Sequence, residues 1–258
     1  MNPVIIALTN QKGGVGKTSL TIHLAGAMIH KNKKVLVVDL DAQGHLSKFF
    51  LGNIYALNKT IRDIIVFEEP AENVIAHTRY KKIDIIPANI SFADVDAQLA
   101  GADDAQYILK DSLEILSRQY DYILMDCPPF LGRATRMALT FATHVIVPVQ
   151  AQEWAAEGAG QLNALIQQTK KRNNPNLEFM GVIINMLMGK RKIETDVKKF
   201  LRNSYGDKVF KTEIKNVAIY PESITRRKMV VGNNSTSKEA KVFIDLFEEI
   251  ESRVQGFQ

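Results

Sequence analysis

The sequence predicts an α/β fold of the P-loop NTPase type, with a doubly wound, mostly parallel sheet flanked by helices on both faces. Apolar runs alternate with helix-like segments along the whole chain, and this alternation is typical of parallel βαβ units. Several of these runs contain hardly any polar residue, as expected for strands that helices cover on both sides. The first run leads through a glycine-rich turn, residues 12–18, into a helical segment, which is the context of a phosphate-binding loop.

The expected elements follow one another without a break. Strands are expected where apolar residues run together, at residues 4–9, 35–39, 83–87, 122–126, 144–148, 179–185 and 209–211. Helices are expected where the pattern is helical, near residues 17–30, 59–66, 104–119, 133–142, 155–171, 193–203 and 236–254. Residues 67–82 and 228–237 are expected to be surface loops. Since no repeat, linker or change of composition intervenes, residues 1–258 are expected to form a single domain.

The composition excludes several classes of protein. With 46% apolar residues, a chain of 258 residues buries a full core. No apolar run reaches the length of a membrane span, and the first residues lack the basic stretch of a signal peptide. A lone cysteine, Cys127, excludes an internal disulfide framework and a pair of cysteines for a bridging iron–sulfur cluster. It suits a reducing cytoplasm, and we interpret it as a small buried residue beside the active site.

The glycine-rich turn has the residues that bind nucleotide phosphates. Its glycines let the backbone curl so that N–H groups converge on phosphate, and the following helix N-terminus adds a partial positive charge. Lys17 is placed to reach the β- and γ-phosphates of ATP, and the Thr18 hydroxyl to ligate Mg²⁺. The nucleotide-binding residues predicted here are Gly13, Gly14, Val15, Gly16, Lys17, Thr18 and Ser19.

A second lysine distinguishes this loop from the general G-x-x-x-x-G-K-[ST] pattern, which would begin on a glycine where the chain has Gln11. Lys12 lies five residues ahead of Lys17. The variant K-G-G-x-G-K-[ST] resembles the deviant Walker A box of the ParA/MinD family of dimeric ATPases, and the chain is most similar to short, Soj-like ParA members. The resemblance implies that Lys12 reaches across an ATP sandwich dimer to the nucleotide of the partner subunit.

Two carboxylates end the second expected strand. Asp39 and Asp41 face the same side of the chain while it remains extended, and a carboxylate near a triphosphate can orient the attacking water. The segment resembles the family's D-x-D-P-Q box, with Ala42 in place of the usual proline. The resemblance implies that Asp41 orients the attacking water and that Asp39 lies near the metal. The catalytic residues expected are therefore Lys12, Lys17 and Asp41.

Another apolar strand, residues 122–126, delivers Asp126 and matches a Walker B segment. Magnesium prefers oxygen ligands and keeps much of its hydration shell, so Asp126 is expected to hold it through coordinated water. The magnesium residues predicted are Thr18, Asp39 and Asp126. After Pro128 and Pro129 the family has a γ-phosphate switch, in which Phe130 stands where relatives usually have a small residue.

Later segments extend the resemblance over most of residues 4–230. Residues 144–150 and 155–158 resemble the strand and the helix that line the family's dimer interface. Asn185 ends a strand where relatives use a polar side chain near adenine. Residues 216–222 resemble the loop that closes over the base, which makes Pro221 a predicted nucleotide contact.

Positive charge gathers in the last third of the chain. Residues 170–258 carry 18 Lys and Arg against 11 Asp and Glu, which indicates a polyanionic partner or an ordinary solvated surface. Short ParA relatives bind nucleoid DNA through phosphate contacts that read no sequence. Ala218 stands where relatives often have a DNA-contacting arginine. The DNA-binding candidates are Lys190, Arg191, Lys192, Lys199, Arg202, Arg226, Arg227 and Lys228.

Together these features predict a ParA-type ATPase that uses ATP and Mg²⁺ for DNA partition or cargo positioning. The expected partners are a second copy in an ATP-dependent homodimer, non-specific double-stranded DNA and a ParB-like activator, and the expected location is the cytoplasm, on the nucleoid. The loop begins eleven residues from the start, so the N-terminal helix-turn-helix of some plasmid ParA proteins is not expected.

Three alternatives stay open. A MinD-like regulator would bind a membrane surface through its last helix, but residues 236–254 end in acidic side chains, whereas such helices are rich in lysine and arginine; no membrane partner is expected. The same ATPase would position a non-DNA cargo if an adaptor encoded elsewhere selected one. A metabolic P-loop enzyme would need a substrate pocket, for which no distinct motif is present.

Overall fold

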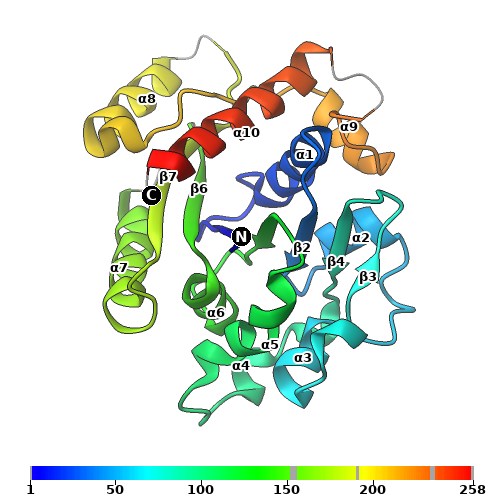
Figure 1. The fold of residues 1–258 in the computed structure, drawn as a ribbon. Coiled ribbons are helices and arrows are strands. Elements are labelled where there is room, and N and C mark those ends of the chain that lie inside the picture. Colours follow the sequence, from blue (N-terminus) through cyan, green and yellow to red (C-terminus); the bar gives the residue numbers. More distant parts are fainter. Residues whose placement is uncertain (1, 152–155, 190–191, 233–235, 257–258) are drawn as a thin grey trace.

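The computed structural model describes residues 2–151, 156–189, 192–232 and 236–256. Within them, seven strands form one sheet in the order β3-β4-β2-β5-β1-β6-β7. Neighbouring strands are parallel except β3 and β4. The strands are β1 (Val4–Leu8), β2 (Val35–Asp39), β3 (Ala76–His77), β4 (Ile83–Ile86), β5 (Tyr122–Asp126), β6 (His144–Gln150) and β7 (Glu178–Asn185). The predicted fold class is confirmed (Figure 1).

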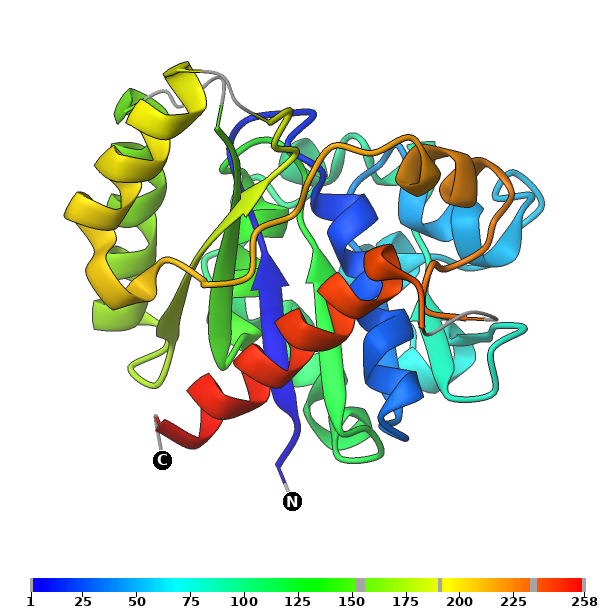
Figure 2. The ribbon, with the colours of Figure 1, turned by 90° about the horizontal axis from the view of Figure 1, so that it is seen from above.

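Helices cover both faces of this sheet, and Figure 2 shows α10 crossing in front of the strands. The α-helices are α1 (Lys17–His30), α2 (His45–Leu51), α3 (Ile61–Phe67), α4 (Val95–Gln98), α5 (Ile108–Ser117), α6 (Arg133–Phe141), α7 (Ala156–Arg172), α8 (Lys192–Tyr205), α9 (Ile219–Thr225) and α10 (Lys238–Gly256). The 3-10 helices are η1 (Ala71–Asn73), η2 (Ile90–Phe92), η3 (Ala105–Tyr107) and η4 (Gly206–Lys208).

Alternate side chains of the strands fill a separate core on each face. Leu36 and Val38 of β2 belong to the core under α5 and α6. Val35 and Val37, on the same strand, belong to the core under α1 and α10. Because both faces are covered, every residue of β2 is buried, which explains why the apolar runs hardly alternate with polar residues.

The last helix packs against the sheet and α1. Phe243, Leu246, Phe247 and Ile250 of α10 are buried in the second core, and each such side chain contributes roughly 1.5–3 kcal/mol through burial. This packing confirms the preferred interpretation of the segment as a core helix. Among the described residues, no helix is long and apolar enough to cross a bilayer.

The predicted strand at residues 209–211 is wrong. Val209 forms one isolated parallel bridge to Val182 of β7, and the chain then runs on along that edge without forming a strand. It lies very close to β7, because a Cβ atom on Gly181 would overlap the carbonyl oxygen of Lys208. Because this contact depends on Gly181 of β7, the sequence of residues 209–211 gives no sign of it.

Several short elements were not predicted. Helices α2 and α9 have seven residues each, and the expected surface loop at residues 67–82 contains η1 and β3. Seven residues make less than two helical turns, too few for an apolar period to stand out.

The carboxyl ends of β1, β2, β5 and β7 meet at one edge of the sheet. Leu8 and Asp39 pair in register with Asp126 from the two sides of β5. Ligands of open α/β sheets bind at this edge, where the strand order reverses. The fold therefore brings together the glycine-rich turn, both predicted acidic strand ends and Asn185.

Candidate active site

The glycine-rich turn is folded as an anion-binding loop. Gly14 and Gly16 adopt left-handed conformations, with φ of 75° and 83°, which glycine adopts without steric cost. A Cβ atom on Gly16 would lie 2.5 Å from the side-chain nitrogen of Asn185. Helix α1 starts at Lys17, and none of the described side chains caps its first turn, so its N–H groups are available to an anion at the loop.

Lys17 lies inside this loop. Its side chain is almost buried, with 7% of the residue exposed, and its ammonium donates to the carbonyl oxygens of Asn10 at 3.1 Å and Lys12 at 3.3 Å. Burial lowers the pKa of Lys17, against the opposing charges of Asp126 and Asp41. The loop thus holds a cation in a dry setting, where an entering phosphate would be its strongest partner. Lys12 is half-buried at the start of the loop, and its N–H donates to Asn10 Oδ1 at 3.0 Å.

Thr18 and Asp126 form a preassembled pair for a hard cation. The Thr18 hydroxyl donates to Asp126 Oδ2 at 2.6 Å. The other carboxylate oxygen, Oδ1, is buried without a hydrogen-bond partner in the described part of the chain. Burial, followed by the nearby charge of Asp39, raises the pKa of Asp126 well above its ordinary value. A buried acceptor lacking a donor costs free energy, and a hydrated Mg²⁺ would relieve that cost, so these residues fit the metal.

The carboxylate of Asp39 accepts hydrogen bonds from residues that follow β2. Its Oδ2 accepts from the N–H of Ser47 at 2.9 Å and from its hydroxyl at 2.7 Å, while Oδ1 accepts from the N–H of Asp41 at 3.1 Å. Burial raises the pKa of Asp39 to about 7, although these hydrogen bonds oppose the rise. The carboxylate therefore fixes the start of α2 and the backbone of Asp41. Its predicted place in the magnesium site stays a prediction.

Asp41 lies at the mouth of a hollow beside the phosphate loop. It is half-buried, and its Oδ1 accepts from the N–H of Gln43 at 2.9 Å. The hollow has a volume of about 240 Å³, and Ala42 and Pro129 line it with Phe130. Phe130 is 47% exposed, so an aromatic ring stands beside the expected position of the attacking water.

A second cavity, of about 180 Å³, opens between the end of β7 and α9. It contains the residues predicted for the base, Asn185 and Pro221, together with Ser19. The full lining is Ser19, Leu20, Asn185, Met186, Ile214, Lys215, Asn216, Tyr220, Pro221, Ile224 and Phe243. Apolar walls with a few polar groups are typical of a pocket for a flat heterocycle.

Asn185 also has a contact that was not predicted. Its amide nitrogen donates to the carbonyl oxygen of Val15 at 2.8 Å, and its Oδ1 accepts from the N–H of Met186 at 2.9 Å. The side chain is buried and ties the base cavity to the phosphate loop. Asn185 therefore acts on the shape of the loop itself.

Comparisons with known proteins agree with this geometry. A family model described as an AAA domain matches residues 4–179. The sporulation initiation inhibitor protein Soj of Bacillus subtilis is 34% identical over 246 residues, which is 95% of this chain and 97% of that protein. The chromosome-partitioning ATPase Soj of Thermus thermophilus is 34% identical over 250 residues, or 97% of this chain and 96% of that one. The chain belongs to the ParA/Soj family of partition ATPases.

A solved structure shares the fold of this ParA/Soj-family chain over almost its whole length. Cobyrinic acid a,c-diamide synthase from Mycobacterium smegmatis, with a bound ATP analog and magnesium, superposes with a TM-score of 0.87 at 26% identity, over 99% of this chain and 97% of that one. The fold of this chain is thus shared with a protein that binds an ATP analog and magnesium.

The candidates for DNA contact fall into two groups. Lys192 and Lys199 are exposed on α8, and Arg226 and Lys228 are exposed after α9. These two helices lie at opposite ends of the upper side of the molecule in Figure 2. Lys190 and Arg191 lie outside the described residues.

Two arginines of the predicted set are engaged within the chain. Arg227 donates from Nε to the carbonyl oxygen of Phe49 and from Nη2 to that of Phe50, both at 2.8 Å. It thereby caps the carboxyl end of α2. Arg202 forms an ion pair with Glu213 at 3.0 Å. Arg227 is therefore unavailable for DNA contact, whereas Arg202 keeps an exposed side chain and shares the carboxylate of Glu213 with Lys198.

Asn10 is a site residue that the sequence interpretation missed in this ParA/Soj-family chain. Its amide nitrogen donates to the carbonyl oxygen of Pro148, and its oxygens accept from the N–H of Lys12 and the ammonium of Lys17. Asparagine commonly bonds to backbone two residues further on, and its position between a strand and the loop was the available signal. Ser47 was missed as well, since nothing in α2 indicates that its hydroxyl meets Asp39.

Proposed function

We propose that this chain is a ParA-type ATPase that partitions DNA or positions a cargo, hydrolysing ATP to ADP and phosphate with Mg²⁺. The observation that carries the proposal is the hydrogen bond between Thr18, at the start of α1, and the buried Asp126, whose Oδ1 lacks a donor in the described structure. The Soj relatives support the biological setting, because one of them is named as a chromosome-partitioning ATPase.

In the proposed binding mode, each part of ATP meets residues of a different element. The loop N–H groups and Lys17 hold the phosphates, and the cavity at Asn185 and Pro221 takes the base. Thr18 and Asp126 hold magnesium, with Asp39 nearby, and magnesium when bound neutralises phosphate charge during phosphoryl transfer. The bound cofactor seen in the cobyrinic acid a,c-diamide synthase structure supports this assignment.

In the proposed reaction, Asp41 orients the water that attacks the γ-phosphate. Its backbone is held by Asp39, so the carboxylate sits at a fixed place beside the loop. Lys17 stabilises the charge on the phosphates within one subunit. Lys12, at the rim of the loop, supplies a second positive charge to the nucleotide of the partner subunit in an ATP sandwich dimer.

The output of the cycle is reversible attachment to DNA. In the dimer, exposed basic residues of both subunits, such as Lys199 and Arg226, would form one cationic surface for non-specific duplex DNA. Hydrolysis separates the subunits and releases the DNA, and a ParB-like partner speeds this step. Location on the nucleoid follows from the same binding.

The alternative of a membrane-surface regulator lacks support in the structure. Its targeting element would be α10, and the apolar face of α10 is buried against α1 and the sheet. A helix with its apolar face already covered has nothing to insert into a bilayer.

The experiment that tests the function is binding of the full chain to random-sequence duplex DNA with ATP, with ADP and without nucleotide, across a series of salt concentrations. We expect tight binding only with ATP, weakening steeply with salt because counterions are released. Lys199→Glu should weaken this binding, while Lys81→Glu, an equal charge change on the turn between β3 and β4, should not. Absence of binding in all three nucleotide states would contradict the DNA-based function.

A further inference from the structure

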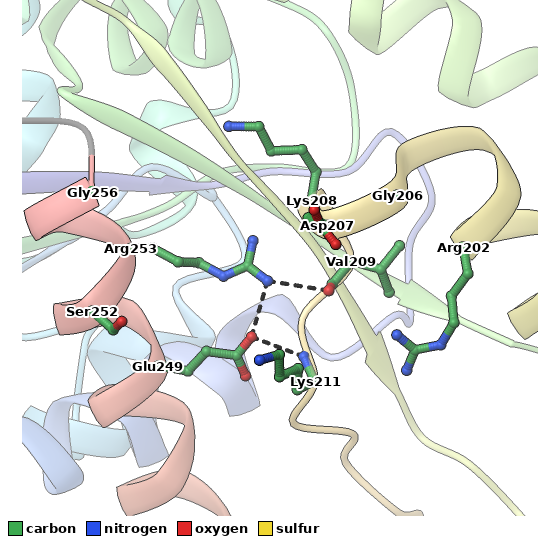
Figure 3. Close-up of a pocket in the computed structure, with 10 residues that line it drawn as sticks. All are labelled: Arg202, Gly206, Asp207, Lys208, Val209, Lys211, Glu249, Ser252, Arg253 and Gly256. Atoms are coloured by element: carbon green, nitrogen blue, oxygen red, sulfur yellow. Dashed lines mark hydrogen bonds and ion pairs between the residues drawn. The ribbon is translucent and has the colours of Figure 1, made fainter.

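A large cavity lies well away from the candidate active site. It is an open hollow with a volume of about 580 Å³, bordered by the end of α8, η4, the segment that follows η4 and the last turns of α10 (Figure 3). Arg253 donates to the carbonyl oxygen of Met180, near the start of β7, whereas the nucleotide residues gather at the end of that strand. The lining consists of Arg202, Gly206, Asp207, Lys208, Val209, Lys211, Glu249, Ser252, Arg253 and Gly256.

The lining carries more positive than negative side chains. Among the described residues that line it, four are cationic and two are acidic. In Figure 3, Arg253 and Arg202 approach the Val209 segment from opposite sides, one from α10 and the other from α8. The four cationic residues thus belong to α8, η4, the segment after η4 and α10.

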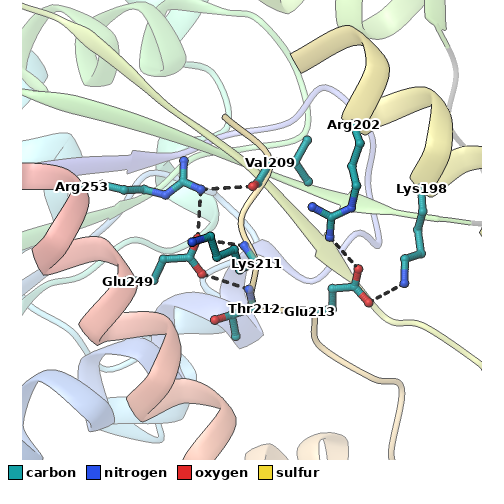
Figure 4. Close-up of polar contacts among 8 residues, drawn as sticks. All are labelled: Lys198, Arg202, Val209, Lys211, Thr212, Glu213, Glu249 and Arg253. Carbon is teal, nitrogen blue, oxygen red and sulfur yellow. Dashed lines mark hydrogen bonds and ion pairs between the residues drawn. The ribbon is translucent and has the colours of Figure 1, made fainter. Parts of the chain in front are cut away.

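One of the two acidic groups is fully used inside the protein. Glu249 accepts from the N–H groups of Lys211 at 2.8 Å and Thr212 at 2.9 Å, and from the Arg253 guanidinium at 2.9 Å (Figure 4). Burial acts to raise the pKa of Glu249, but these hydrogen bonds outweigh it and the pKa is lowered. The carboxylate is therefore ionised and satisfied, and it neutralises Arg253 alone.

The lining as a whole carries a surplus of positive charge, because its four cationic residues meet two carboxylates, Glu249 and Asp207. Arg202 shares Glu213 with Lys198, whose ammonium lies 2.6 Å from that carboxylate (Figure 4). The ammonium of Lys211 has no ion pair in the described part of the chain. The pKa of Lys208 is lowered, first by burial and then by the charges of Arg253 and Lys170, against the opposing effect of Glu178. An anion in the cavity would balance this surplus.

We propose that this cavity is a binding site for phosphate groups, separate from the nucleotide site. A phosphate presents several charged oxygens, which match donors that arrive from three directions, and the planar fork of Arg202 suits it particularly. The segment's N–H groups at 211 and 212 are already taken by Glu249, so recognition falls to the side chains of Arg202, Lys208 and Lys211. The volume accommodates more than one phosphate group.

Arg253 forms the fixed floor of the site. Its guanidinium donates to the carbonyl oxygens of Met180 and Val209 and lies 4.0 Å from the centroid of the Phe210 ring. Replacing Arg253 would disturb the packing of α10. Lys211 is the better residue to change, because its side chain is exposed and makes no ion pair with described residues.

The test is a titration of inorganic tripolyphosphate into the full chain saturated with ADP, without added magnesium, followed by the amide NMR signals of single residues. The amides of Lys211 and Thr212 report on this cavity, and those of Gly16 and Lys17 report on the phosphate loop. We expect saturable shifts at Lys211 and Thr212. In Lys211→Glu, followed at Thr212, the dissociation constant should rise about tenfold or more, since one attraction becomes a repulsion. Lys81→Glu should leave it unchanged.

A second arm identifies the source of the phosphate. Duplex DNA binding in the presence of ATP is compared for Lys211→Glu and Lys81→Glu. A loss of both tripolyphosphate and DNA binding in Lys211→Glu supports a site for the DNA backbone. A loss of tripolyphosphate binding alone supports a site for a free phosphorylated ligand. Unshifted signals at Lys211 and Thr212, or equal tripolyphosphate affinity in wild type and Lys211→Glu, would overturn the proposal whatever happens to DNA.

Discussion

Two buried carboxylates on adjacent strands illustrate how partners decide the role of a residue. Asp39 and Asp126 pair in register between β2 and β5, and burial raises the pKa of both. Asp39 receives three hydrogen bonds from the turn that follows it. Asp126 receives one from Thr18 and keeps an oxygen without a donor among the described residues. The first therefore supports backbone, and the second is the group suited to a cation.

Asn185 gives a prediction at the same scale. Replacing it with alanine removes the hydrogen bond to Val15, which supports the phosphate loop. A neutral hydrogen bond contributes about 0.5–1.5 kcal/mol, so the affinity for ADP should fall about three- to tenfold. Asn203→Ala is the matched control, because it removes an exposed asparagine on α8 that does not line this cavity. Equal nucleotide affinity in wild type and Asn185→Ala, measured by calorimetry, would show that the loop keeps its shape without this strut.

Elements far apart in the chain are joined by single side chains that sequence patterns do not reveal. Arg227, after α9, caps α2, and α10 holds the segment after η4 through Glu249 and Arg253. Each of these contacts joins elements whose positions are set by the tertiary fold. For this reason, the charged residues predicted to bind DNA divide, in the structure, into exposed residues and residues that are bonded to other parts of the chain.

Arg226 and Arg227 form a natural pair for comparison. Arg227→Ala removes two hydrogen bonds to the carboxyl end of α2 and should lower the free energy of unfolding by about 1–3 kcal/mol. Arg226→Ala removes an exposed side chain and should change it by less than about 0.5 kcal/mol. Urea denaturation of both variants measures the difference. Similar stabilities would mean that the cap of α2 is dispensable.

Gly181 controls how closely the segment after η4 approaches β7. Gly181→Ala should destabilise the protein by more than about 3 kcal/mol, because a new Cβ atom would overlap the Lys208 carbonyl oxygen. Gly189→Ala separates this clash from backbone strain: its φ is also positive, at 122°, but nothing lies within 4 Å of the added atom. Thermal unfolding should therefore show a much larger loss for Gly181→Ala. If both variants lost the same amount of stability, the positive φ of the backbone, and not the overlap with Lys208, would account for the whole effect.

Over the whole molecule, the nucleotide half was much more predictable than the basic half. The strands leading to Lys17, Asp39 and Asp126 are mostly apolar runs of five residues each, and parallel pairing brings their carboxyl ends to one edge of the sheet. Motifs of this kind specify their own geometry, because their residues lie close together in the sequence. The committed role of Arg227 and the contact between Asn185 and Val15 depend on residues about 170 or more positions apart. No local pattern specifies such pairs.

The stability of the whole fold should depend on pH through His23. This residue is buried under Tyr220 and Phe243, and burial lowers its pKa to about 3. The unfolded chain, with an ordinary pKa near 6.5, takes up a proton that the fold excludes. The contribution of neutral His23 is thus complete above about pH 6.5 and is lost as the pH falls toward 3, by about 1.4 kcal/mol per pH unit at most.

Urea denaturation at about pH 7 and about pH 5.5 measures this slope. Asp39, whose raised pKa of about 7 gives a pH dependence of the opposite sign, is present in both proteins. Relative to its value at about pH 7, the free energy of unfolding at about pH 5.5 should therefore be higher in His23→Leu than in wild type. His45→Leu, which changes an exposed histidine at the start of α2, should retain the wild-type slope. If the free energy of unfolding changed equally with pH in wild type and His23→Leu, groups other than His23 would cause the acid sensitivity.

The way the chain returns along β7 has a consequence for association. The outward carbonyl oxygens of Val182 and Ile184 accept from Phe210 and Ile214, and that of Met180 accepts from Arg253. At the opposite border, β3 has two residues only and runs antiparallel to β4. A sheet is extended by another chain through free backbone groups on a long border strand. Among the described strands, neither border offers a long row of free carbonyl oxygens, so we expect copies of this chain to meet through side chains and loops and the folded form to resist strand-to-strand aggregation.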